Sequence, residues 1–275
     1  MSEVVDLTVV ESRPNLAGGS MFTANEVPYS AIIDPELCPI PEKTDSYQPL
    51  SNAQQIGIVR RAMETRGFSL IQQRYGLSCK GKRMVFLQAW DHPDLPKDRD
   101  MHLFTGGLNS YDKSVAAKLG LGGSLFVCEN LQMAAEIELH RRHTLNVIED
   151  FEYLVEDAAD KALPMFLDLS EDMKTLKHVE IDQVRGYQLL GEALGAWGTN
   201  DEFLSPQQVN AACKAWKTPL HESFADRNLF SWYQAANEAL KKSPAHAMMD
   251  RLSALHRFAQ KVAVDVDSPL LITQQ

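Results

Sequence analysis

The chain has 275 residues, 44% of them hydrophobic and 23% charged, and its formal net charge is −10 at pH 7. This composition is typical of a soluble globular protein, and no apolar run approaches the ~20 residues that a membrane-spanning helix needs. The four cysteines are scattered, and none forms a C-x-x-C pair. This spacing argues against a structural zinc site and favours reduced thiols in a cytoplasmic protein.

The charge is distributed unevenly along the chain. Residues 59–83 hold seven bases and one acid, whereas residues 146–182 hold eleven acids and three bases. Such segregation indicates a partner of opposite charge more directly than the net charge does. A solvated basic face without a ligand is the alternative.

The first predicted elements are an arm and a helix. Residues 1–50 are rich in proline and predict an extended arm, in which only "VVDLTVV" (4–10) favours a strand. Ser51 is a good N-cap and Gln54 completes a capping box, so a helix is predicted to begin here. Gly67 is predicted to stop this helix.

A run of predicted strands follows. "FSLIQQRYGLSC" (68–79) and "KRMVFLQAW" (82–90) have strand composition, and Lys80–Gly81 predicts a hairpin turn between them. "MHLFTGG" (101–107) and "GSLFVC" (123–128) predict two further strands. Sequential strands with short links favour an antiparallel meander.

A long helix is predicted from Asn130, with apolar residues at helical spacing between Thr144 and Ala158. Pro164 is expected to interrupt it. Two later serine–proline pairs, Ser205–Pro206 and Ser243–Pro244, each place an N-cap before a proline at the first helical position. Further helices are predicted over residues 184–198, 206–217, 228–242 and 244–264.

Strands followed by helices predict an α+β fold, with a small antiparallel sheet at about residues 50–130 packed against a long helix and a C-terminal helical region. We interpret residues 1–50 as an extended arm and residues 51–163 as a sheet-plus-helix core. Residues 164–275 are interpreted as a helical region that packs on this core as one unit.

The glycine-rich stretch 103–130 fails the tests for phosphate-binding loops. Its glycines do not fit G-x-G-x-x-G, because Leu125 stands at the third position, and no P-loop string exists. "GGLNSYDKS" (106–114) therefore favours a wide turn, with a polar nest that contacts phosphate as the alternative. A serine nucleophile would need a general base held next to it. His102 is only a neighbour in the sequence, so this hypothesis has little support.

Two further chemical hypotheses are weak. Glu136, His140 and His143 are spaced i, i+4 and i+7 on the predicted helix, but no H-E-x-x-H motif accompanies them. We therefore favour a polar helix face over a metal site and predict no metal or cofactor. Cys128 ends an apolar run and favours a buried, inert thiol.

The order of the motifs resembles a family of phage- and plasmid-encoded proteins known chiefly as a domain of unknown function. The resemblance rests on "YQPLSN" (47–52), "GGLNSYDKS" (106–114), "LFVCENL" (125–131), "RRHT" (141–144) and "WYQAANEALKK" (232–242). It implies a phage or prophage origin and no particular activity. The residues that it singles out are Asn109, Ser110, Asp112, Ser114, Cys128, Asn130, His143 and Thr144.

We predict a non-enzymatic accessory protein of the host-cell cytoplasm that binds single-stranded nucleic acid, as recombination or annealing proteins do, and that can form a homo-oligomer. Phosphates would follow a basic helix and hairpin, and Tyr75 would stack on a base. The basic residues are Arg60, Arg61, Arg66, Arg74, Lys80, Lys82 and Arg83.

The alternative is an inhibitor that blocks a host defence protein or another host enzyme. In that hypothesis the acidic segment 146–182 would dock on a basic partner protein. Neither hypothesis includes a membrane partner.

Overall fold

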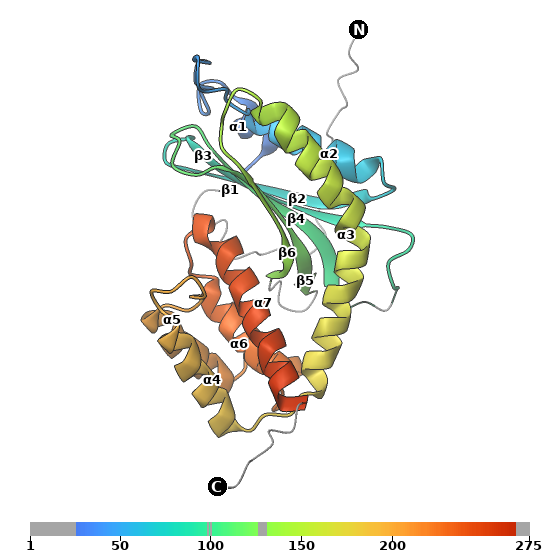
Figure 1. The fold of residues 1–275 in the computed structure, drawn as a ribbon, viewed down its shortest axis with the longest axis vertical. Coiled ribbons are helices and arrows are strands. Elements are labelled where there is room, and N and C mark those ends of the chain that lie inside the picture. Colours follow the sequence, from blue (N-terminus) through green and yellow to red (C-terminus); the bar gives the residue numbers. More distant parts are fainter. Residues whose placement is uncertain (1–25, 98, 100, 126–130, 268–275) are drawn as a thin grey trace, which may run out of the picture.

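The computed structural model describes residues 26–97, 99, 101–125 and 131–267. Its centre is an antiparallel sheet in which each strand is hydrogen-bonded to the next one along the chain (Figure 1). This order confirms the predicted meander. The strands are β1 (Glu26–Val27), β2 (Ser69–Ser78), β3 (Arg83–Asp91), β4 (Met101–Ser110), β5 (Ala117–Leu125) and β6 (Leu131–Arg141).

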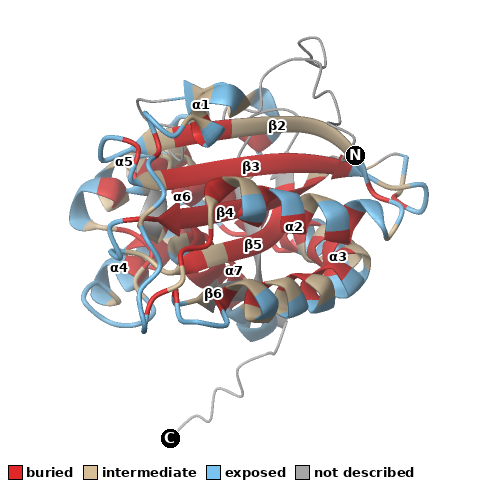
Figure 2. Ribbon diagram, turned by 90° about the horizontal axis from the view of Figure 1, so that it is seen from above, coloured by how far each residue is buried: buried red, intermediate tan, exposed pale blue. Residues whose placement is uncertain are grey.

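Helices cover both faces of this sheet. Figure 2 shows α2 and α3 over one face, and α7 packs on the other, where a Cβ at Gly106 of β4 would lie 3.2 Å from the Met249 methyl. The predicted α+β class is therefore confirmed. The helices are α1 (Tyr29–Ile33), α2 (Asn52–Glu64), α3 (Val147–His178), α4 (Gln183–Gly195), α5 (Pro206–Lys217), α6 (Leu229–Leu240) and α7 (Ala245–Asp267), with a 3₁₀ turn at Glu222–Phe224.

Buried side chains from the sheet and from all the long helices join in one hydrophobic core. β3 is buried along nearly its whole length because both of its faces are covered (Figure 2). Among the described helices, none has the length and apolar character needed to cross a bilayer.

The predicted signals at the starts of α2 and α5 are confirmed. The Ser51 hydroxyl accepts a hydrogen bond from the Gln54 amide, and the Gln54 side chain accepts one from the Ser51 amide. Ser205 and Gln208 make the same reciprocal pair at the start of α5. Each pair satisfies two backbone donors that a helix start would otherwise leave open.

The prediction of a helix from Asn130 is wrong, because residues 131–141 form β6. β6 pairs with β5 from Ser124↔Leu131 to Ala117↔Arg141, with one irregularity after Gly120. The sequence "LQMAAEIELHR" places an apolar residue at every second position from 131 to 139, which is the strand period. Helix α3 begins only at Val147.

Pro164 does not interrupt α3, which also runs unbroken across the interpreted boundary at residues 163–164. An interior proline costs about 3 kcal/mol through the lost hydrogen bond and a clash with the preceding turn. Here the neighbouring residues Ala162, Met165 and Phe166 are buried, and that burial offsets the cost. The predicted strand at 4–10 and the end of the predicted strand 123–128 lie outside the described residues.

The Trp216 side chain of α5 packs directly on Gly186 of α4. A Cβ there would lie 2.3 Å from Nε1 of Trp216, and the Gly186 carbonyl accepts a hydrogen bond from Nε1 of Trp232 at 3.0 Å. Only glycine lets the Trp216 indole approach this turn of the helix so closely.

Replacing Gly186 by Ala is expected to destabilise the protein by about 1–3 kcal/mol, because the added methyl overpacks a buried indole contact. A urea denaturation midpoint measures the change. Gly57→Ala is the matched control, since it lies in α2 with open space around the new Cβ. The control should gain about 0.5–1 kcal/mol from the higher helix propensity of alanine. Equal effects at the two sites would contradict the proposed packing constraint.

Candidate functional site

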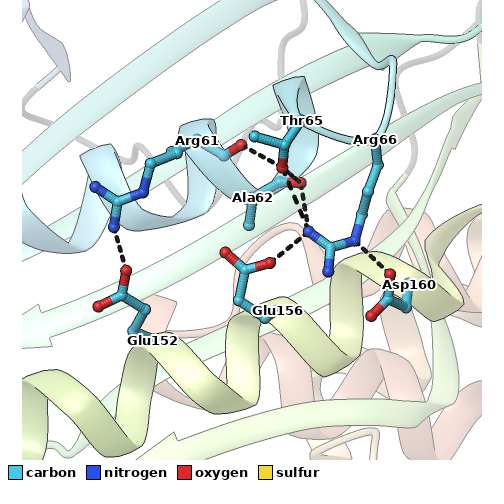
Figure 3. A network of polar contacts seen from close by, with 7 residues as sticks. All are labelled: Arg61, Ala62, Thr65, Arg66, Glu152, Glu156 and Asp160. Atoms are coloured by element: carbon cyan, nitrogen blue, oxygen red, sulfur yellow. Dashed lines mark hydrogen bonds and ion pairs between the residues drawn. The ribbon is translucent and has the colours of Figure 1, made fainter.

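The basic end of α2 faces the acidic side of α3. Arg61 forms an ion pair with Glu152, and Arg66 forms ion pairs with Glu156 and, at 2.6 Å, with Asp160 (Figure 3). These pairs join residues that are 90 to 94 positions apart in the sequence. Two arginines of the basic segment are therefore paired with three acids of the acidic segment within the chain.

The other arginines of the predicted basic surface also have carboxylate partners. Arg60 pairs with Glu64 at 2.7 Å, within α2. Nε and Nη2 of Arg74 donate to the two carboxylate oxygens of Glu26 at 2.8 and 2.7 Å, and these hydrogen bonds lower the pKa of Glu26. The remaining pair joins Arg83 to Asp112 at 2.9 Å. The structure therefore does not form the predicted arginine surface.

Tyr75 is not a stacking platform, because it is only 3% exposed. Its ring packs against Tyr29 with centroids 5.4 Å apart, and burial raises the pKa of the Tyr75 phenol. The prediction that this aromatic presents its face to a base is wrong, since its side chain is buried and the Tyr29 ring of α1 packs against it. Lys80 and Lys82, by contrast, are exposed and have no ion pair among the described residues.

Three of the sequence motifs meet at the start of α2. Nδ2 of the buried Asn109 donates to the Leu50 carbonyl at 2.8 Å and to Oδ1 of Asn52 at 2.9 Å. The Asn52 amide donates to the Tyr111 hydroxyl at 2.9 Å. This network fixes the first turn of α2 on the end of β4.

His143 joins the same network from the third motif. Its Nδ1 accepts a hydrogen bond from the Leu50 amide at 3.1 Å, and its ring lies 5.6 Å from the Tyr47 ring. Burial lowers the pKa of His143, against an opposing effect of the Gln48 backbone. His143 therefore holds the chain entry to α2 and is not a member of a helical metal face.

Ser110, Asp112 and Ser114 close the turn between β4 and β5, but Gly106–Ser110 of the predicted wide turn belong to strand β4. The Ser110 hydroxyl donates to the Val115 carbonyl at 2.7 Å and accepts from the Val115 amide at 3.0 Å. Asp112 accepts from the Ser114 amide at 3.0 Å and pairs with Arg83. These hydrogen bonds outweigh the desolvation of Asp112 and lower the pKa of its carboxyl.

The metal hypothesis required Glu136, His140 and His143 on one face of a helix. That arrangement is not formed, because Glu136 and His140 lie on strand β6. Within the described ranges, no group of three His, Cys, Asp or Glu side chains is placed to hold a metal ion. Asn130 and Cys128 lie outside the described residues.

The structure adds Lys113, which sequence reasoning missed. The β2–β3 turn and the β4–β5 turn lie at the same end of the sheet, because β3 and β4 are neighbours and the Tyr111 amide donates to the Lys82 carbonyl at 2.7 Å. Lys113 sits in the second turn with its Nζ 4.3 Å from the centre of the Tyr47 ring. We call Lys80, Lys82 and Lys113 the turn lysines.

Both turns hold left-handed backbone at residues other than glycine. Among the described residues, Cys79, Lys80 and Lys113 are the non-glycine residues with positive φ, at 53°, 57° and 62°. This conformation costs an L-residue roughly 1–2 kcal/mol, so glycine or asparagine is the usual choice. The left-handed conformation of these residues is a property of the backbone, so the sequence pattern did not reveal it.

A family model described as "Domain of unknown function (DUF932)" matches residues 42–260. This range contains all five motifs on which the resemblance rests. No curated protein and no solved structure matches the chain.

Replacing Arg66 by Ala is expected to lower the free energy of unfolding by about 1–2 kcal/mol, because a guanidinium with several charge-assisted hydrogen bonds is lost. Arg61→Ala is the control. Its side chain is 58% exposed, and an exposed ion pair contributes less than about 1 kcal/mol. Urea titrations of the two variants give the comparison. An Arg61→Ala loss as large as that of Arg66→Ala would contradict the ranking.

Acid should weaken the fold through His143. The pKa of the folded imidazole lies below its ordinary value of 6.5, so the unfolded chain binds the proton more readily. The contribution of a neutral His143 is complete above about pH 6.5 and is lost as the pH falls toward the folded pKa. His143→Gln should flatten this loss between neutral and mildly acidic pH, measured by urea midpoints. His178→Gln, an exposed site at the end of α3, should leave the wild-type pH dependence unchanged.

Proposed function

Because the chain belongs to the family described as a domain of unknown function (DUF932), no activity comes with its family, and we propose that it binds single-stranded nucleic acid without catalysing a reaction. The contact surface is formed by the turn lysines, Lys80, Lys82 and Lys113, and not by the arginines of α2. The resemblance to phage- and plasmid-encoded proteins supports an accessory role, and recombination or annealing is the process that we propose for it.

The observation that carries this proposal is the backbone conformation of two of these lysines. Lys80 and Lys113 adopt φ of 57° and 62°, and both are exposed to solvent. A lysine at such a position destabilises the fold relative to glycine. Strained backbone of this kind at an exposed residue is typical of residues kept for a ligand.

The charges at this end also support phosphate as the ligand. Each turn lysine is a compact ammonium, and none of the three pairs with a carboxylate of the described residues. A flexible single strand can place successive phosphates on neighbouring turns. Binding then depends on counterion release and is insensitive to base sequence, since Tyr75 is buried.

Acidic residues restrict the affinity at the same end. The loop 34–47 packs on the β2–β3 turn, where a Cβ at Gly81 would lie 1.7 Å from the Leu37 carbonyl oxygen. This loop carries Asp34, Glu36, Glu42 and Asp45. The net charge of the surface is therefore low, and we expect weak binding that disappears at moderate salt.

A protein partner is the second candidate function. The acids Glu152 and Glu156 of the segment 146–182 are held by arginines of the chain itself, so a partner would use another surface. The observation that favours such a partner is a group of exposed apolar side chains near the β2–β3 turn. They are Ile33, Leu37 and Ile40, which are 52%, 51% and 56% exposed.

A triple change of the turn lysines to Gln should weaken binding of a fluorescent oligo(dT) at low salt and reduce the log–log salt slope by about 2, at ~0.7 per lost phosphate contact. Fluorescence anisotropy across a salt series measures both quantities. The control changes Lys161, Lys214 and Lys217 to Gln, which removes the same charge from exposed sites on α3 and α5. Equal losses in the two triple variants, or no binding by the wild-type chain, would overturn the proposal.

Changing Lys80 and Lys113 to Gly should separate stability from binding. Relief of the left-handed strain is expected to raise the free energy of unfolding by roughly 1 kcal/mol per site. The same change should weaken oligo(dT) binding, because two ammonium groups are lost. Urea midpoints and anisotropy are measured on the same preparation. A variant that gains stability and keeps full affinity would show that these lysines do not contact the ligand.

A further inference from the structure

A polar cavity lies between helix α7 and the loop that joins α4 to α5. Its volume is about 290 Å³, which is at the small end of the range for ligand sites. The loop contributes Asn200 to its lining, and α7 contributes Ser253 and Arg257. The turn lysines do not line it, so the cavity is a site of its own.

Ser253 places a hydroxyl without a partner in this lining. The residue is only 2% exposed, and its Oγ makes no hydrogen bond to the described part of the chain. A serine inside a helix can bond to the backbone carbonyl one turn earlier, and Ser253 does not. Because a buried hydroxyl without a partner destabilises the fold, Ser253 indicates a ligand that forms a hydrogen bond at this point.

Arg257 supplies a positive charge that the chain leaves unpaired. The other charges of the cavity are neutralised internally. Nζ of Lys118 lies 2.8 Å from Oδ1 of Asp250, and Nη2 of Arg251 lies 3.5 Å from Oε1 of Glu202. The Arg257 side chain is exposed and has no ion pair among the described residues. The cavity therefore carries one excess positive charge.

These donors fit a phosphate group. Arg257 lies one helical turn after Ser253 on the same side of α7, and Asn200 lines the cavity from the loop. A phosphate monoester has three terminal oxygens that accept hydrogen bonds, and an arginine can bind two of them. A guanidinium, a hydroxyl and an amide from two elements suit such a group better than the two oxygens of a carboxylate.

Trp197 offers a surface for a planar ring next to the cavity. Its side chain is 42% exposed, whereas the other three tryptophans are buried. The guanidinium carbon of Arg251, which lines the cavity, lies 5.7 Å from the centre of a Trp197 ring. An exposed aromatic ring beside an arginine is a typical stacking surface for a nucleobase.

We propose that the cavity is a binding site for a nucleoside monophosphate. Arg257, Ser253 and Asn200 hold the phosphate, and the base stacks on Trp197. The site goes beyond the proposed binding of single strands, because it uses none of the turn lysines and needs no nucleic acid. Asp201 is an exposed acid next to Asn200 and repels the anion, so we expect an affinity weaker than micromolar.

Isothermal titration calorimetry of the full chain with thymidine monophosphate tests the phosphate contacts. Arg257→Gln should weaken binding about tenfold or more, because a charge-assisted hydrogen bond is lost. Arg142→Gln is the matched control and should keep full affinity, since Arg142 is another exposed arginine without an ion pair among the described residues. No binding by the wild-type chain, or equal losses in the two variants, would overturn the proposal.

Ser253→Ala separates binding from stability. It should weaken binding of thymidine monophosphate about fivefold. The urea midpoint should not fall, because the hydroxyl has no partner among the described residues and alanine is the better helix former. Ser231→Ala should keep full affinity and is the control, since Ser231 is an equally buried serine of α6 whose hydroxyl also lacks a partner there. A folded Ser253→Ala variant that binds like wild type would contradict the proposed contact.

Inorganic phosphate and the variant Trp197→Ala test the base contact. The wild-type chain should bind thymidine monophosphate about tenfold more tightly than inorganic phosphate, and the nucleotide should quench the fluorescence of Trp197. Trp197→Ala should bind the two probes equally. Equal affinities of the wild-type chain for the two probes would rule out a nucleotide as the ligand.

Oligo(dT) distinguishes a free nucleotide from a strand. Arg257→Gln should keep the wild-type affinity for oligo(dT), whereas the triple variant of the turn lysines should keep the wild-type affinity for thymidine monophosphate. The two proposals can therefore fail separately. An Arg257→Gln variant that loses affinity for oligo(dT) as well would overturn the assignment of the cavity to a free nucleotide.

Discussion

The ion pairs between α2 and α3 determine which charges of this chain a ligand can reach. Arg61 and Arg66 form ion pairs with Glu152, Glu156 and Asp160, which are distant in the sequence and are brought together by the fold (Figure 3). The basic and the acidic segment of one chain can each bind a partner of opposite charge, or they can form ion pairs with each other. In this chain residues of the two segments form ion pairs with each other. The turn lysines have no ion pair among the described residues, and they lie at one end of the sheet, where the backbone is strained.

Features that depend on residues close together in the sequence were predicted correctly, whereas features that depend on distant residues were not. The capping boxes at Ser51 and Ser205 depend on residues three positions apart, and both helices begin where predicted. β6 was not predicted, although its apolar residues alternate. A strand is stable only when it pairs with a neighbour, here β5. The helical periodicity that begins at residue 144 was also extended backwards over this segment. Arg66 and Asp160 are 94 positions apart in the sequence, so no local pattern predicts their pairing.

The candidate site shows the same division. The motif residues Asn109 and His143 were identified from the sequence, but their role as supports for the first turn of α2 depends on the Leu50 backbone, which no side-chain pattern reports. Buried amides and imidazoles of this kind need each other, since a single loss leaves the remaining partners unsatisfied in a medium without water. The sequence did not single out Lys113, because the identity of a residue does not specify its φ angle.

Helix α3 has 32 residues and is about 48 Å long, so it spans both the sheet and the C-terminal helices. Its buried residues, from Val147 to Leu176, belong to the one core that also contains residues of the sheet and of the C-terminal helices. Neither part can detach without exposing half of this apolar surface to water. The molecule should therefore melt in a single cooperative transition, with the sheet and the helical region losing structure at the same temperature.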